Sequence, residues 1–241
     1  MQMRQNPAKE YLESEGVLIP YDPAVITPAI KHAIVSGYFE AEEAAQLPHI
    51  VKPGDIVLDI GAGIGFISTL IARRAERVIS VEANPDLLPF MAELHALNGI
   101  QNATRLNVVL GDVEAGLATF YLRKDFWMGS LSKGPNPYKS KIKVPYMALN
   151  ALLMTERVSL IVCDIEGAEA FLFNRADLAC VDRVYLELHD HITGLNGVAD
   201  VFADLATQGF AYDPRSSSGA IVLFRRVEKN EVLRPYARQS Q

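Results

Sequence analysis

Cysteine, tryptophan and long apolar runs are all scarce in this chain of 241 residues. It has two cysteines, one tryptophan and no run approaching the roughly 18 apolar residues of a membrane span. Cys163 and Cys180 lie in apolar, strand-like surroundings, which is typical of a reduced cytoplasmic protein and not of a disulfide scaffold. Residues 1–7 contain no apolar signal segment. We therefore predict a soluble cytoplasmic protein without a membrane partner.

An excess of positive charge is missing as well. The chain has 23 Lys and Arg against 29 Asp and Glu, which gives a net charge of −6. Such a chain has no general attraction for nucleic acid, so no nucleic-acid partner is expected. Its length suffices for one large domain that buries roughly 70% of the surface exposed by the unfolded chain.

The glycine-rich loop after the first predicted strand lacks one glycine of the dinucleotide fingerprint. An apolar strand at about 56–60 leads into Gly61, Gly63 and Gly65, and apolar residues then recur at helical spacing. Such strand-to-helix turns hold nucleotide-like cofactors in open α/β sheets. The fingerprint Gly-x-Gly-x-x-Gly would need its third glycine where Phe66 stands. An NAD-dependent oxidoreductase is therefore the less favoured alternative.

Asp59 precedes this loop by two residues. The arrangement Asp-x-Gly-x-Gly-x-Gly resembles the first-strand motif of Rossmann-like S-adenosylmethionine-dependent methyltransferases. The backbone of such a loop approaches a ligand closely, and the start of the next helix favours a carboxylate. We therefore predict S-adenosylmethionine as the cofactor. The predicted contacts in this motif are Asp59, Gly61, Ala62, Gly63, Gly65 and Phe66.

Acidic residues also follow the next two predicted strands. The strand at 77–82 ends in Glu82, 23 positions after Asp59, which is close to the spacing at which a carboxylate accepts hydrogen bonds from ribose hydroxyls. Ala83 belongs to the same predicted contact. The strand at 104–110 leads to Asp112, which in the methyltransferase pattern would accept from the adenine amine. Gly-Asp is also an ordinary turn pair, so both interpretations of Asp112 stay open.

Alternation of strands and helices predicts a doubly wound α/β fold. Right-handed crossovers then give a mostly parallel, seven-stranded, Rossmann-like methyltransferase sheet with an antiparallel terminal strand. Two further buried strands are expected at 158–164 and 183–189, and a terminal antiparallel pair at 210–212 and 220–224. The predicted divisions are a helical N-terminal extension at 1–50, an S-adenosylmethionine-binding catalytic domain at 51–227 and a polar tail at 228–241.

Residues 123–143 interrupt this alternation. The segment contains Trp127 and six basic residues against the single acid Asp125. An exposed aromatic with basic neighbours in a long loop is suited to a substrate lid. A solvated loop whose aromatic residues pack locally is the equally weighted alternative.

Four motifs together resemble the FkbM family of S-adenosylmethionine-dependent methyltransferases over about residues 50–190. They are residues 57–66, 81–85, 164–169 and 186–189, and Asp-Ile-Glu-Gly-Ala-Glu after the fourth strand is the most distinctive. The resemblance implies methylation of a hydroxyl on a natural product or saccharide-like small molecule. Asn150 departs from the aspartate that relatives commonly carry.

The chemistry needs an acceptor oxygen held in line with the methyl group and a group that takes its proton. His189 is the leading general base, and Asp164 and Glu166 would position the acceptor or assist. Asp164 is also expected at the cofactor. A strand-end histidine with a purely structural role is an equally open interpretation of His189.

Three other interpretations were weighed. Asp164, Glu166, Glu187, His189 and His191 could hold Mg²⁺ or Mn²⁺, but their spacing matches no recognised ligand pattern, so no metal is expected. A non-catalytic S-adenosylmethionine-binding domain stays open. A nucleic-acid N-methyltransferase is disfavoured because no Asn/Asp-Pro-Pro-Tyr/Phe motif follows the fourth strand. Nothing in the sequence predicts the oligomeric state.

Overall fold

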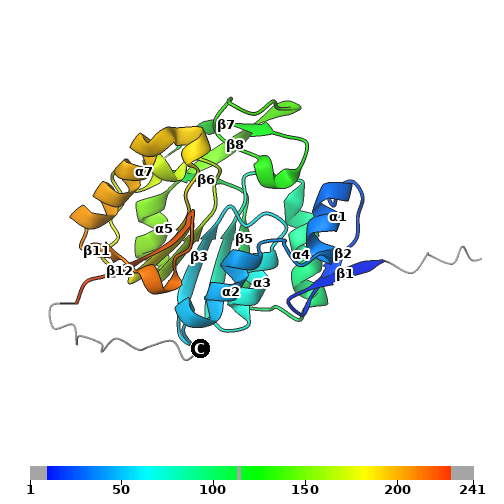
Figure 1. Ribbon diagram of the computed structural model, residues 1–241, viewed down its shortest axis with the longest axis horizontal. Helices are drawn as coiled ribbons and strands as arrows, with labels where there is room; N and C mark the ends of the chain where they lie inside the picture. Colours follow the sequence, from blue (N-terminus) through cyan, green and yellow to red (C-terminus); the bar gives the residue numbers. More distant parts are fainter. Residues whose placement is uncertain (1–9, 113–114, 229–241) are drawn as a thin grey trace, which may run out of the picture.

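A seven-stranded sheet forms the centre of the computed structural model, which describes residues 10–112 and 115–228 (Figure 1). The strand order is β5-β4-β3-β9-β10-β12-β11. The first five of these are mutually parallel, and β12 runs antiparallel to both its neighbours. The predicted doubly wound, Rossmann-like sheet with an antiparallel terminal pair is confirmed. The strands are β3 (Ile56–Ile60), β4 (Arg77–Val81), β5 (Ala103–Leu106), β9 (Leu160–Cys163), β10 (Arg183–Glu187), β11 (Phe210–Tyr212) and β12 (Ile221–Arg226).

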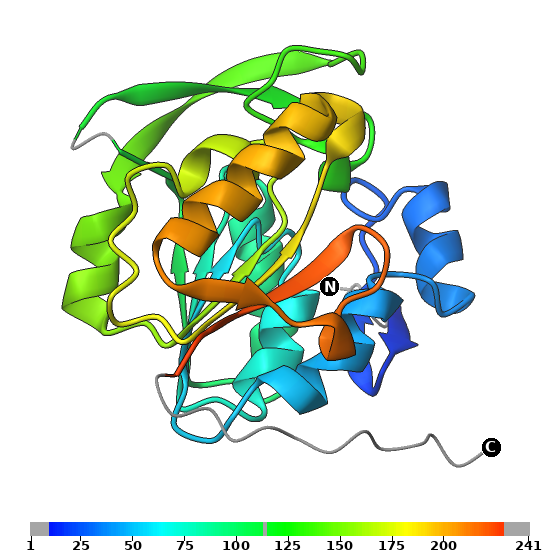
Figure 2. The same cartoon turned by 60° about the vertical axis from the view of Figure 1, so that its left-hand side comes forward.

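Two apolar cores lie on opposite faces of this sheet, with helices covering both (Figures 1 and 2). Successive side chains of a strand point to opposite faces, so Val57 joins one core and Leu58 the other. One face packs against α2 (Ala41–Ile50), α3 (Phe66–Ala72) and α4 (Leu87–Leu97). The other packs against α5 (Leu149–Glu156), α6 (Glu169–Leu172) and α7 (Asp190–Thr207).

A second sheet of three strands lies beside the carboxyl edge of the main one. Its order is β6 (Val109–Gly111), β8 (Ser140–Ala148), β7 (Leu117–Leu122). The single strand expected at 104–110 is therefore wrong, because the chain leaves the main sheet after β5. The side chain of Asn107 donates to the carbonyls of Glu82 and Ala83 at this break and satisfies them there.

The described part of the N-terminal extension starts with two strands and not with a helix. β1 (Tyr11–Ser14) and β2 (Val17–Pro20) form an antiparallel hairpin, followed by α1 (Pro28–Val35). Glu15 and Gly16 occupy the turn, both with positive φ, which is the geometry of a tight hairpin turn. The helical prediction for 1–50 therefore holds only for its second half. The predicted tail at 228–241 lies outside the described residues apart from Glu228.

Both cysteines are free: Cys163 is buried in β9, whereas Cys180 is exposed in the turn before β10. The strand-like setting expected for Cys180 is therefore wrong. Within residues 10–112 and 115–228, none of the helices has the length and apolar character needed to cross a bilayer.

Candidate functional site

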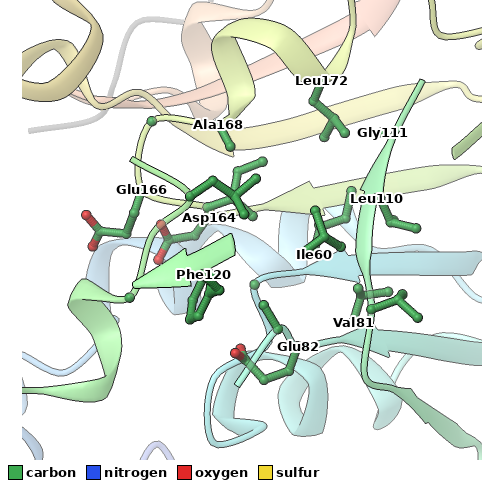
Figure 3. Close-up of a pocket in the computed structure, with 18 of the residues that line it drawn as sticks. Ile60, Val81, Glu82, Leu110, Gly111, Phe120, Asp164, Glu166, Ala168 and Leu172 are labelled. Carbon is green, nitrogen blue, oxygen red and sulfur yellow. The ribbon is translucent and has the colours of Figure 1, made fainter. Parts of the chain in front are cut away.

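A cavity of about 500 Å³ opens at the carboxyl ends of β3, β4 and β9 (Figure 3). Parallel strands end at the same edge of a sheet, and there such folds bind ligands. Glu82 lies at one side of the cavity, and Asp164 and Glu166 lie at another. The remaining walls come from the glycine loop, the second sheet and the segment after β9.

The glycine loop is folded tightly against the start of the segment after β9. The amides of Gly61 and Ala62 both donate to the carbonyl of Val81. A β-carbon on Gly61 would lie 1.7 Å from the carbonyl oxygen of Asp164, so no larger residue fits. Gly65 has a φ of 88°, and a β-carbon there would lie 2.5 Å from Cγ of Met91.

The six residues of this motif that are predicted to contact the cofactor lie in different places. Gly61 and Gly63 line the main cavity, whereas Asp59 and Ala62 line a smaller cavity beside it. Phe66 is fully buried, with its ring centroid 5.3 Å from that of Phe39. Gly65 and Phe66 line neither cavity and shape the start of α3 by packing, and their contact with the cofactor stays a prediction.

Glu82 lies on the cavity wall, as the spacing predicted. Its carboxylate accepts hydrogen bonds from the amides of Gly63, at 2.9 Å, and Asn84, at 2.6 Å. Burial nevertheless raises its pKa to about 7. Ala83, the next residue, also lines the cavity. The oxygens of Glu82 keep lone pairs for further donors, because a carboxylate offers about four acceptor positions.

Asp59 is buried under the glycine loop. Its Oδ2 atom has no hydrogen-bond partner among the described residues. Burial and the nearby Glu82 raise its pKa to about 7. Asp59 lines the smaller cavity and not the main one, so a contact with a ligand in the main cavity would be indirect.

Asp112 lies at the other end of the cavity, beyond Leu110 and Gly111. Its side chain is exposed and forms an ion pair of 3.2 Å with Arg175. It is within the cavity lining where the methyltransferase pattern expects it, and its role toward adenine stays a prediction.

Asp164, Glu166 and His189 meet beside the cavity. The Nε2 atom of His189 lies 3.4 Å from Oδ1 of Asp164 and 3.9 Å from Oε2 of Glu166. The two carboxylates line the cavity, whereas His189 is 4% exposed and does not line it. The three predicted catalytic residues are therefore brought together, with the imidazole behind the carboxylates.

Glu169 holds His189 in place from the other side. Its Oε1 atom accepts from the backbone amide of His189 at 2.9 Å and lies 3.1 Å from Nδ1. Burial lowers the pKa of His189, but the bond to Glu169 and the charges of Asp164 and Glu166 outweigh burial and raise it to about 9. Burial and Glu187 raise the pKa of Asp164 well above its usual range. The cluster therefore places three carboxyl groups around one imidazole.

Glu187 and His189 belong to different elements. β10 ends at Glu187, and His189 is already the residue that precedes α7. Glu187 lines the smaller cavity, while His189 turns toward Glu169. The His191 ring lies 5.7 Å from that of His189, outside the three-residue cluster.

Glu40 is a site residue that sequence reasoning missed. It lies in the N-terminal extension, has a φ of 48° and lines both cavities. No hydrogen bond of its carboxylate occurs among the described residues. Burial, followed by Glu43 and Asp164, raises its pKa well above the usual range. No sequence motif around Glu40 indicates a site residue, because its place at the cavity depends on how the N-terminal extension packs against the sheet.

The insertion also differs from an exposed lid. Its η1 helix (Phe126–Met128) lines the cavity with Phe126 and Trp127, and the Trp127 ring stacks on Phe39 at 6.1 Å. Arg123 is buried and donates to the carbonyls of Met128 and Ser132. Residues 140–143 belong to β8. The aromatic side chains of the insertion therefore pack as a wall of the cavity, while five of its six basic residues are exposed: Lys124, Lys133, Lys139, Lys141 and Lys143.

Comparisons with known proteins point to one superfamily. Residues 30–121, less than half of the chain, match the model of the TRM5/TYW2 methyltransferase domain. A ribosomal RNA small subunit methyltransferase A from Pelotomaculum thermopropionicum is 29% identical over 177 residues, which is 73% of this chain and 50% of that protein. A probable enzyme of the same name from Methanosarcina mazei is 37% identical over 90 residues, 34% of this chain and 31% of that one. The chain thus spans half or less of the length of these curated relatives.

A solved structure supports the fold. The crystal structure of Trm5b from Pyrococcus abyssi has a TM-score of 0.51 at 15% identity and covers 92% of this chain and 56% of that one. The fold and the partial family match are both similar to those of class I S-adenosylmethionine-dependent methyltransferase domains. These matches support the superfamily and the cofactor, but they do not support the FkbM assignment.

Proposed function

We propose that this domain methylates a hydroxyl group of a small molecule with S-adenosylmethionine as methyl donor. The observation that carries the proposal is the position of Asp164 and Glu166, backed by His189, on the wall of the cavity that also contains the glycine loop and Glu82. Cofactor elements and proton-accepting groups thus meet in one cavity.

The residues present fit the cofactor. Gly61 and Gly63 line the cavity with main-chain atoms only, and the space beside their α-carbons is filled by the Asp164 carbonyl and the Phe126 ring. The Glu82 carboxylate would accept from the ribose hydroxyls, and the wall from Leu110 to Asp112 would face the adenine. Glu40 would hold the ammonium of the methionine part, because its carboxylate lines the cavity and is near the acidic groups of Glu43 and Asp164.

When bound, S-adenosylmethionine supplies a methyl group activated by its sulfonium; a carbon–oxygen bond forms, the carbon–sulfur bond breaks, and S-adenosylhomocysteine and a proton leave. Asp164 and Glu166 would hold the acceptor hydroxyl in line, which contributes the largest part of such an acceleration. The cluster with His189 would withdraw the proton, an effect typically of 10²–10⁴-fold. The same negative charges favour a cationic donor in the cavity.

A small acceptor suits the walls. The cavity measures about 500 Å³ and includes the aromatic side chains of Phe120, Phe126 and Trp127, as small-molecule sites commonly do. Arg123 is held inside the insertion, and Lys139 and Lys143 bind a carbonyl and a hydroxyl of the same hairpin. The FkbM resemblance rests on the motif from Asp164 to Glu169 and supports the same choice.

RNA is the second candidate acceptor. The specific observation in its favour is that the matched curated relatives are named as ribosomal RNA methyltransferases. The net charge of −6 and the acids at the cavity oppose binding of a phosphate backbone.

Transfer of labelled methyl groups tests both acceptors. The purified chain would be incubated with labelled S-adenosylmethionine and either a panel of small hydroxyl compounds, including saccharides, or total RNA. Label in small products that is lost in Asp164→Asn supports the proposal, and label in RNA alone overturns it. Stoichiometric cofactor binding without any product would indicate a non-catalytic binding domain. Binding titrations with NADH and with S-adenosylhomocysteine test the oxidoreductase alternative. That alternative predicts that NADH binds and S-adenosylhomocysteine does not.

A further inference from the structure

We propose that Asp164, Glu166 and His189 bind a divalent cation of the Mg²⁺ or Mn²⁺ type at the edge of the cavity. Each offers one ligand atom, and the three atoms lie within 4.8 Å of one another. Only the role of the ion rests on the proposed function; the site itself is argued from the geometry of the three side chains.

The distances suit an ion between the three atoms. Nε2 of His189 lies 3.4 Å from Oδ1 of Asp164 and 3.9 Å from Oε2 of Glu166. Octahedral bonds of about 2.1 Å place neighbouring ligand atoms about 3 Å apart and opposite ones about 4.2 Å apart. Small side-chain rotations therefore suffice to complete the site.

Glu169 fixes the imidazole in the form that a metal requires. Its Oε1 atom accepts from the backbone amide of His189 and is paired with Nδ1, and its Oε2 atom accepts from the amide of Gly167 at 2.9 Å. With Nδ1 paired to Glu169, Nε2 is the ring nitrogen that faces Asp164 and Glu166, and a bound cation would take the place of its proton. Such carboxylate–histidine pairs orient metal ligands in many proteins.

The three atoms that face one another need a cation or a proton between them. Oδ1 of Asp164 is buried and has no hydrogen-bond partner among the described residues. The His189 side chain is 4% exposed, and its Nε2 atom makes no hydrogen bond within that part of the chain. Two carboxylate oxygens and a nitrogen lone pair repel one another unless a cation or a shared proton lies between them.

The donor set indicates the kind of ion. Two carboxylates suit hard cations such as Mg²⁺ and Mn²⁺, and the single imidazole is compatible with Mn²⁺. Three protein ligands on one side leave positions that face the cavity, because Asp164 and Glu166 line it. An acceptor oxygen bound there would lose its proton more readily.

Direct binding of Mn²⁺ tests the site without any methyl acceptor. The full chain would be treated with a chelator, desalted and titrated with Mn²⁺, with free Mn²⁺ measured by electron paramagnetic resonance. We expect one saturable site that Mg²⁺ competes for. Glu166→Gln and Glu169→Gln should each weaken it by about 10–100-fold. Asp200→Asn, on the exposed side of α7, is the matched control and should leave it unchanged.

A second measurement needs no variant. Mn²⁺ should broaden the imidazole nuclear magnetic resonance signals of His189 at concentrations that leave those of the exposed His49 unaffected. Absence of saturable binding, equal affinity in Glu166→Gln and Asp200→Asn, or equal broadening of both histidines overturns the proposal in favour of a shared proton. S-adenosylhomocysteine binding by the metal-free chain is measured in parallel, so failure of the cation site and failure of the proposed function are distinguished.

Discussion

The carbonyl oxygen of Asp164 lies 1.7 Å from the position that a β-carbon on Gly61 would occupy. The first loop of the cofactor site and the first residue of the acidic motif are thus in direct backbone contact. A change in either segment should move the other.

Gly61→Ala should therefore disable the site. The substitution must displace Asp164 and accept a φ of +86°, which together should cost about 3 kcal/mol or more in stability and abolish S-adenosylhomocysteine binding. Gly54→Ala is the control, because Gly54 has a φ of +85° and no atom within 4 Å of the added carbon. It should cost only about 1–2 kcal/mol. Thermal unfolding and calorimetry check both, and equal losses would contradict the role of the contact.

Binding of S-adenosylhomocysteine should strengthen as the pH rises through about 7. The pKa of Glu82 is raised to about 7 by burial, and ribose hydroxyls donate stronger hydrogen bonds to its ionised form than to its neutral form. Binding is therefore accompanied by proton release in this window. Glu82→Gln should weaken binding by about 10–100-fold and flatten the profile, whereas the exposed Glu76→Gln should preserve it. Asp59 also has a pKa of about 7. The pH profile of Asp59→Asn therefore shows how much of the pH dependence comes from Asp59 and how much from Glu82. A flat wild-type profile would refute the prediction.

Glu40→Gln should weaken S-adenosylhomocysteine binding by about tenfold or more, because a charged hydrogen bond to the ammonium is lost. Binding of 5′-methylthioadenosine, which has no ammonium, should be unaffected. Glu42→Gln, two residues along and exposed, is the control. Parallel losses for the two ligands would show that Glu40 acts only on the shape of the cavity.

Acid should destabilise the fold through His95. Burial and the nearby Arg105 lower the pKa of this histidine to about 4, while in the unfolded chain it titrates near 6.5. The unfolded state therefore binds more protons below about pH 6.5, and stability falls by on the order of 2–3 kcal/mol as the pH drops toward 4. His95→Gln should remove most of this slope and can still bond Ser68. The exposed His49→Gln should retain it in urea unfolding at pH 4.5 and 7.

The sequence predicted those strands and turns that depend on residues close together in the chain. β3 and β4 lie within a few residues of their expected positions, because apolar periodicity and glycine turns act over short stretches. Glu82 on the cavity wall followed from spacing alone, since each parallel strand delivers its last residue to the same edge.

Contacts between distant segments were decided only by the tertiary structure. Thr27 bonds Asp125 across 98 positions and joins the N-terminal extension to the insertion, which turns an expected lid into a wall. Glu40 reaches the cavity, and Glu169 orients His189, for the same reason. The sequence by itself determined the sheet, the glycine loop and the cofactor class. Packing between segments without any shared local pattern determined which side chains face the acceptor.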